Sequence, residues 1–184
     1  MAAFDAESAA RSAAVPPERR KWVEVPTERV KELREKTGAG VMDCKRALAE
    51  ANGDMERAIA ILRERGLAQV AKRAGRETVE GVVESYLHAG GRIGVLVEVN
   101  CETDFVARTP DFRTLAHDVA MQIAATDPPS IDGAPDPASD ILPLMRQPFI
   151  KDASRTVADL VKDTAAKTGE NIVIRRFAHY QLGS

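Results

Sequence analysis

Cysteine, histidine and aromatic residues are scarce in this chain of 184 residues. It holds two cysteines, three histidines and 4% aromatic residues. Two cysteines far apart in the sequence form no disulfide framework and, with so few histidines, no zinc site, so they favour a reducing compartment. The shortage of aromatic side chains also argues against stacking on single-stranded nucleic acid. We therefore expect no metal ligation and no redox chemistry at these residues.

Long apolar runs and an excess of one charge are missing too. No apolar run approaches the roughly 18 residues that span a membrane. The formal net charge is −2, with acidic and basic residues interspersed, whereas a nucleic-acid-binding protein normally presents a basic face. Neither a P-loop nor a GxGxxG motif is present, so no nucleotide cofactor is expected. These absences leave protein binding as the expected role, without membrane, nucleic acid or cofactor.

The first 25 residues are rich in Ala, Ser, Arg and Pro and show little apolar periodicity. They lack the apolar segment of a secretory signal, and several acidic residues argue against an organellar transit peptide. We predict a flexible extension over residues 1–25. A bacterial cytoplasm is the expected location, and an organellar matrix is less favoured.

Residues 26–66 carry three short helical patterns, which predict a compact three-helix bundle. Thr27 and Asp54 are the predicted N-caps of the first and third helices, and Gly66 is the predicted end of the third. The predicted helices cover residues 27–36, 41–51 and 55–65.

A helical connector is predicted over residues 67–78, followed by an α+β domain over residues 79–184. Paired glycines between the first two strand-like runs are typical of a hairpin, and the proline-rich stretch 126–143 predicts a loop. The expected fold class is α+β, with the bundle followed by a helix-flanked, three-stranded antiparallel sheet. The predicted strands cover 79–87, 92–99 and 171–180, and the predicted helices begin after the caps Thr103, Thr109 and Ser154.

The stretch from Val95 to Val106 begins as a strand rich in β-branched residues and restarts as a helix at Thr103. Thr103 is a good N-cap, and Asp104 suits the positive end of a helix dipole. Phe105 has two interpretations, since an aromatic in the first turn of a helix can point into the core or stand out as a wedge. The residues alone favour an ordinary first-turn acid and a core phenylalanine.

Two further pairs of residues are candidates for function. Val41 and Met42 begin the second predicted helix, where they are either core contacts or an exposed binding surface. Cys101 and His117 could act as a thiol and its base. No third group that would orient them is evident, and a cysteine at a strand end is usually a small buried hydrophobe. The residues therefore do not predict an enzyme.

Four blocks of the chain resemble the elongation factor Ts family, and they occur in the family's order. The blocks are Val30–Lys45, Glu98–Ala107, Gln147–Asp152 and Gly169–Phe177. The resemblance runs from about residue 26 to the end of the chain. It implies a guanine-nucleotide exchange factor that binds the GTPase elongation factor Tu and speeds the loss of GDP. It also implies that the N-terminal bundle is similar to ubiquitin-associated domains.

The resemblance assigns roles to two groups of residues. The first group falls where the family's N-terminal domain contacts the GTPase domain, and it comprises Arg34, Val41 and Met42. The second group matches the segment that intrudes near the magnesium ion of the bound nucleotide, and it comprises Thr103, Asp104, Phe105 and Val106.

Two departures from the family pattern bear on assembly. Long members have a core of two related halves, and this chain has room for one. The stretch 126–143 is also shorter than the helical insert expected even in short members. Short members can supply the second half by pairing, so the resemblance allows a homodimer, formed through an exposed edge of the strand at 171–180.

The alternative function is a ubiquitin-associated-type adaptor, in which residues 27–66 bind a partner and the rest is scaffold.

Overall fold

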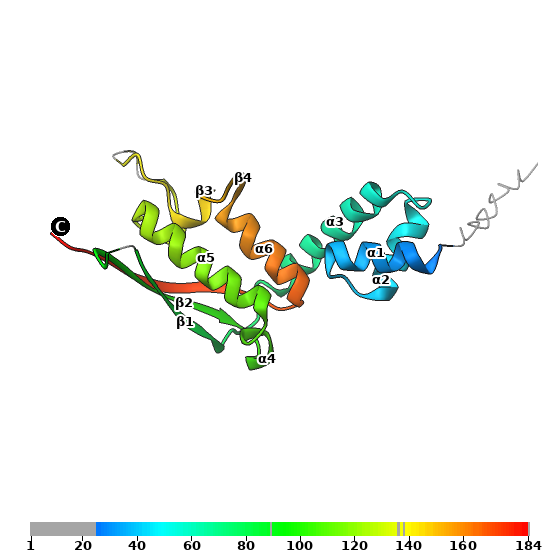
Figure 1. Cartoon of the computed structure of the whole chain (residues 1–184), viewed down its shortest axis with the longest axis horizontal. Helices are drawn as coiled ribbons and strands as arrows, with labels where there is room; N and C mark the ends of the chain where they lie inside the picture. The colour runs from blue at the N-terminus through cyan, green and yellow to red at the C-terminus, as the bar shows by residue number, and fades with distance from the viewer. Residues whose placement is uncertain (1–24, 89, 136, 138, 184) are drawn as a thin grey trace, which may run out of the picture.

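The computed structural model describes residues 25–183 except 89, 136 and 138. A helical bundle forms one end of the molecule and a sheet covered by helices forms the other, as Figure 1 shows. Both predicted parts are therefore present, and the α+β class is confirmed. The predicted extension over residues 1–25 lies outside the described residues, apart from Val25.

The bundle consists of α1 (Thr27–Thr37), α2 (Val41–Glu50) and the first half of α3 (Met55–Arg73). Gly38 ends α1 in the left-handed conformation, with φ of 68°, and Asp54 caps α3 by accepting a 2.9 Å hydrogen bond from the Arg57 N–H. The bundle has an apolar cluster of its own. Its buried members are Val30, Leu33, Cys44, Ala47, Leu48, Ala51 and Ala58.

Two predicted helix boundaries in this region are wrong. Thr27 is the first residue of α1 and not its cap, because the cap position is Pro26 and no side chain caps the helix there. Gly66 does not end α3, which continues to Arg73, so the predicted third helix and much of the predicted connector form one helix. A Cβ on Gly66 would lie only 3.0 Å from the Cβ of Ala166. Glycine at this position permits close approach between α3 and α6 (Val157–Thr168), so Gly66 serves helix packing and not helix termination.

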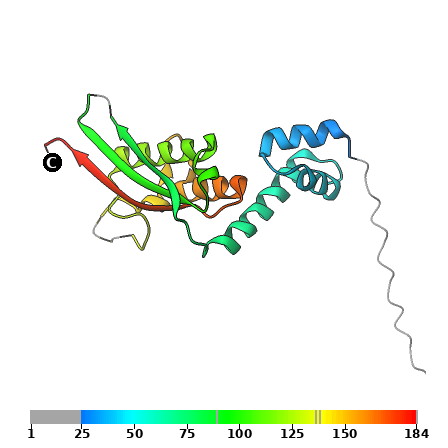
Figure 2. The same cartoon turned by 90° about the horizontal axis from the view of Figure 1, so that it is seen from below.

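The sheet has the predicted three antiparallel strands, in the order β1 (Glu80–Leu87), β2 (Ile93–Cys101) and β5 (Val173–Gln181). Two helices, α5 (Pro110–Thr126) and α6 (Val157–Thr168), cover one face of it (Figures 1 and 2). The N-cap of α5 is Thr109, as predicted.

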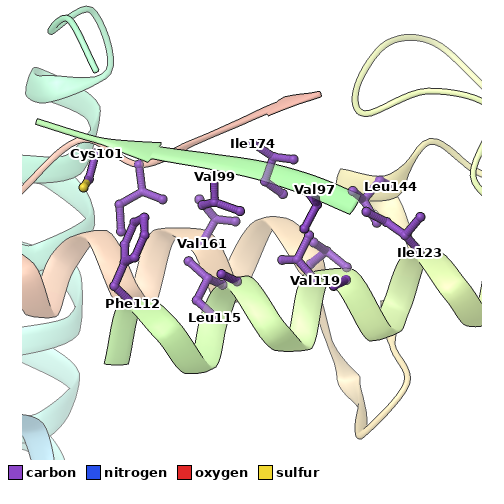
Figure 3. Close-up of a cluster of buried hydrophobic side chains, with 14 of the residues drawn as sticks. Val97, Val99, Cys101, Phe112, Leu115, Val119, Ile123, Leu144, Val161 and Ile174 are labelled. Atoms are coloured by element: carbon purple, nitrogen blue, oxygen red, sulfur yellow. The ribbon is translucent and has the colours of Figure 1, made fainter. Parts of the chain in front are cut away.

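The main core lies between that face and the helices (Figure 3). Alternate residues of β2 point inward, as the two-residue period of a strand requires. Figure 3 shows Phe112 near the Cys101 end of β2, whereas Ile123 and Leu144 lie towards the other end. The largest fully buried side chains here include Phe112, Ile123, Leu144, Val97, Val99 and Val119.

The segment between α5 and α6 contains the predicted loop, since residues 127–143, where described, form neither helix nor strand. After it come the short helix η1 (Leu144–Arg146), β3 (Pro148–Phe149) and β4 (Asp152–Thr156). The predicted cap Ser154 is wrong, because it lies within β4 and its Oγ donates to Asp152 Oδ1 at 2.6 Å. Thr156 caps α6 instead and forms a capping box with Asp159.

The outer face of the sheet carries exposed apolar side chains from all three strands. Residue pairing aligns Leu87, Gly94 and Tyr180 across the sheet, and the next row on the same face is Ser85, Leu96 and Ala178. Leu87 is 74% and Tyr180 67% exposed, and Leu96 is also exposed. Isolated exposed apolar residues are common, but a cluster on one sheet face is typical of an interaction surface.

Candidate functional site

The segment predicted to bind a partner forms a short helix, α4 (Asp104–Ala107), directly after β2. Thr103 is its N-cap, as predicted, and its Oγ1 accepts from the Val106 N–H at 3.5 Å. Val106 and Ala107 are buried against the core, whereas the Phe105 side chain is 79% exposed. The interpretation of Phe105 as a core residue is therefore wrong, and the ring stands out from the surface.

Asp104 lies in the first turn of α4, where its charge suits the helix dipole. Its carboxylate forms an ion pair with Arg108 at 2.8 Å, one turn further along the chain. Both side chains are well exposed, and surface pairs of this kind contribute roughly 0–1 kcal/mol. Asp104 therefore acts on α4 mainly as a first-turn acid.

The base of α4 is held from outside by Glu170, which lies between α6 and β5. Glu170 Oε2 accepts from the backbone N–H groups of Glu102 and Thr103, each at 3.0 Å. Glu170 Oε1 accepts from the Thr103 hydroxyl at 2.6 Å. One carboxylate therefore fixes the two residues that precede the helix.

Glu102 makes the reciprocal contact. Its Oε1 accepts from the Asn171 N–H at 2.7 Å, and its Oε2 accepts from Arg76 Nη1 at 3.2 Å. The Asn171 amide and, less strongly, the Arg76 guanidinium lower the pKa of Glu102 below its ordinary value of 4.5. Glu102 is therefore ionised at neutral pH and binds both donors. Sequence reasoning assigned no role to Glu102, Glu170 or Asn171.

The second predicted group lies on the bundle, and all three of its side chains are exposed. Val41 and Met42 form the start of α2, immediately after Gly40, and they are 49% and 65% exposed. The interpretation of these two residues as core contacts is wrong. Arg34 lies in the last turn of α1. Figure 1 shows α2 in the bundle and α4 on the sheet domain, so the two predicted groups occupy different parts of the molecule.

Cys101 and His117 have separate partners. The Cys101 thiol is fully buried and donates to the Thr103 carbonyl at 3.1 Å. Burial raises the pKa of the Cys101 thiol to about 11, so it is protonated at neutral pH. The His117 ring is half exposed and lies 3.4 Å from Glu84 Oε1. This geometry gives no support to a thiol nucleophile.

Two other kinds of feature are missing from the part of the chain that the structure describes. There, no group of three or more His, Cys, Asp or Glu side chains is placed to hold a metal ion. The helices of the same residues include none that is both long and apolar enough to cross a membrane.

Comparison with known proteins identifies relatives over most of the chain. The family described as elongation factor TS matches residues 20–142 and 102–184. Elongation factor Ts of Moorella thermoacetica is 49% identical over 189 residues, covering 84% of this chain and 93% of that protein. Elongation factor Ts of Carboxydothermus hydrogenoformans is 50% identical over 194 residues, covering 86% of this chain and 89% of that protein.

The two alignments span 189 and 194 positions but include only 84% and 86% of the 184 residues of this chain. The remaining positions are therefore gaps in this chain. Each of these relatives therefore has residues without a counterpart here.

Proposed function

This chain belongs to the elongation factor Ts family of translation elongation factors, and we propose that it binds elongation factor Tu·GDP and accelerates the release of GDP. The observation that carries the proposal is Phe105, an aromatic ring that is 79% exposed on a helix whose base is held by charged side chains. It lies in the segment that resembles the family's intruding segment. This role requires no chemical catalysis by the chain itself.

The proposed mechanism is a disturbance of the magnesium and phosphate site of the GTPase. Mg²⁺ requires near-ideal octahedral geometry and bridges the protein to the nucleotide phosphates. A ring inserted between the elements that hold the metal's water shell needs to move them only slightly to weaken the ion. The phosphates then lose both the metal and the position of the loop that binds them, so GDP leaves faster.

Binding of the factor and of the nucleotide must oppose each other equally. If the factor weakens the affinity for GDP, GDP weakens the affinity for the factor by the same ratio. A newly bound GTP therefore expels the factor by the same linkage. The direction of exchange is set by nucleotide concentrations and by the GTPase, and not by selection at Phe105.

We propose that the bundle supplies a second contact with the GTPase, through Arg34, Val41 and Met42. The exposed pair at the start of α2 gives this contact its apolar part, and Arg34 gives it a positive charge. Two contacts from one chain raise the effective concentration of each for its own site. In this arrangement the bundle contributes affinity, and α4 contributes the displacement that releases GDP.

We also propose a homodimer, which is supported by the exposed apolar side chains on the outer face of the sheet. Val83, Leu87, Leu96 and Tyr180 lie on the face opposite α5 and α6, where a second copy would cover them. A two-fold axis through this face would pair the same patch on both copies. The proposed contact is the face of the sheet, whereas the sequence predicted an edge at the last strand.

The relatives come from bacteria, and we place this protein in the bacterial cytoplasm, where translation occurs. The test of the proposed function is the release rate of labelled GDP from bacterial elongation factor Tu, with and without the protein. Acceleration supports exchange. An unchanged rate, together with capture of ubiquitin, would favour the adaptor function instead.

A further inference from the structure

Two carboxylates at the base of α4 bind each other's backbone segments. Glu170 accepts from the N–H groups of Glu102 and Thr103, and Glu102 accepts from the N–H of Asn171. One segment follows the end of β2 and the other precedes the start of β5, its antiparallel neighbour in the sheet, so this is a tertiary link and not a local turn. We call these four residues, Glu102, Thr103, Glu170 and Asn171, the carboxylate clamp.

Helix α4 needs such a link because it is only four residues long. A helix this short does not form on its own, since nucleation is unfavourable and few hydrogen bonds follow. Its internal cap is weak as well, because the bond from the Val106 N–H to Thr103 Oγ1 is 3.5 Å long. By contrast, the Thr103 hydroxyl donates to Glu170 at 2.6 Å. Bonds to a charged carboxylate are shorter and roughly twice as strong as neutral ones.

The clamp also reaches the end of α3. Arg76 Nη1 donates to Glu102 Oε2 at 3.2 Å, and the Asn171 side-chain amide donates to the Arg76 carbonyl at 2.9 Å and to the Ala74 carbonyl at 3.4 Å. Ala74 directly follows α3, the helix that begins in the bundle. The clamp therefore connects the base of α4 to α3, the helix that continues into the bundle, and the bundle's helices α1 and α2 carry the other predicted partner-binding group.

From this geometry we infer that Glu170 and Glu102 are positioning residues for nucleotide exchange, which act through Phe105. They fix the backbone of residues 102–103, and that backbone sets the direction in which α4 presents the ring. The inference rests on the proposed exchange function. It adds residues that the family resemblance did not assign and that lie behind the exposed ring.

The test uses the full chain with Glu170→Ala, Glu170→Gln and a control, Glu50→Ala. Glu50 is an exposed carboxylate that pairs with Arg65 on the bundle, away from the clamp. The GDP release rate from elongation factor Tu is measured at saturating factor. Misplacement of a group by about 1 Å can reduce a rate by roughly a hundredfold, so we expect Glu170→Ala to lower the maximal rate at least about tenfold. The maximal release rate with Glu170→Gln should lie between those with Glu170→Ala and with the unsubstituted chain, because the amide oxygen of glutamine can still accept from the two N–H groups.

Two further readouts separate positioning from a general loss of fold. Amide hydrogen exchange in Glu170→Ala should rise at Glu102 and Thr103 and stay low at Val97 and Val99 in the core of β2. Glu170→Ala is also combined with Phe105→Leu, which removes the aromatic ring but keeps an apolar side chain. If Glu170 acts through the ring, Glu170→Ala should reduce the maximal GDP release rate by a smaller factor in the Phe105→Leu background than in the unsubstituted chain.

Three results would overturn the inference. The first is an unchanged release rate in Glu170→Ala although the amides of Glu102 and Thr103 have lost protection. The second is a reduction of the GDP release rate by Glu170→Ala that is equally large with and without Phe105→Leu. The third is the absence of acceleration by the unsubstituted chain, which contradicts the exchange function itself and is therefore distinguishable from the other two. If Glu170→Ala does not fold, the same comparisons are made with Glu170→Gln, and an unchanged rate in that variant with both amides deprotected counts against the inference.

Discussion

Phe105 and Val106 are neighbours in α4, yet their side chains lie in opposite surroundings. Val106 is 9% exposed and packs against the main core, whereas Phe105 is 79% exposed. An exposed phenylalanine adds nothing to the core, and the buried valine beside it keeps the helix in place. The pair therefore separates anchoring from presentation within two residues.

Met42→Glu should weaken binding to elongation factor Tu without changing the maximal rate of GDP release. The Met42 side chain is exposed and would lose an apolar contact with the partner, for which a loss of about tenfold in affinity is typical of an important interface residue. The measurement is a titration of the release rate against factor concentration. Ile150→Glu, an exposed apolar residue outside both predicted contacts, is the matched control and should leave the midpoint unchanged. An equal shift in both variants would contradict the assignment.

Gly81→Ala should lower the free energy of unfolding by about 2 kcal/mol or more. Gly81 has φ of 151°, and an added Cβ would lie 2.1 Å from the Val99 carbonyl oxygen, so the paired backbones of β1 and β2 would have to separate. Gly75→Ala is the control, because a Cβ there meets nothing within 4 Å. Urea unfolding of both variants checks this. Equal stability of the two would show that the β1–β2 pairing tolerates the extra atom.

Glu102→Gln should be less stable than the unsubstituted protein at neutral pH, and this difference in stability should become smaller as the pH falls. The folded-state pKa of Glu102 lies below 4.5 because the Asn171 amide and Arg76 stabilise the carboxylate. A lowered folded pKa means that the stabilisation is fully present above the ordinary pKa and is lost as the pH falls through the folded value. Unfolding midpoints of both proteins between pH 7 and pH 3 provide the measurement. A difference that stays constant across this window would contradict the ionised contact.

Leu87→Asp should dissociate the proposed homodimer. Leu87 lies in the outer apolar row of the sheet, and a buried, unpaired carboxylate at the two-fold interface is strongly unfavourable. Analytical ultracentrifugation over a range of concentrations should show dimers for the unsubstituted chain and monomers for Leu87→Asp. Ile141→Asp, an exposed apolar residue off the sheet, should remain dimeric. A chain that is monomeric at every concentration would exclude this assembly.

Regular local patterns predicted much of the fold correctly. The alternation in 92–99, the paired glycines before it and the sequence Thr109-Pro110-Asp111 each depend on neighbouring residues, and β2 and α5 follow them. Gly66 could not be interpreted in this way, because its reason is contact with Ala166 on a helix far along the chain. The predicted cap Ser154 is wrong although a local signal for the true cap exists, since Thr156 and Asp159 have the spacing of a capping box.

The candidate site was predictable only in part, for the same physical reason. Thr103 as a cap is a local feature, and so is the acid at Asp104. The exposure of Phe105 depends on which face of α4 meets the core, and a helix of one turn has no periodicity to reveal it. The pairing of Glu102 with Asn171 joins residues 69 positions apart, which no local pattern indicates.

The central claim is that Phe105 drives GDP release, and the most direct test is stopped-flow release of fluorescent GDP from bacterial elongation factor Tu. The unsubstituted chain should accelerate release by about tenfold or more, because a coupling of roughly ten- to a hundredfold in affinity is expressed mainly in the dissociation rate. Phe105→Ala should return the rate close to that of elongation factor Tu alone, with stability unchanged within about 0.5 kcal/mol because the ring is exposed. Acceleration by Phe105→Ala equal to that of the unsubstituted chain would contradict the claim.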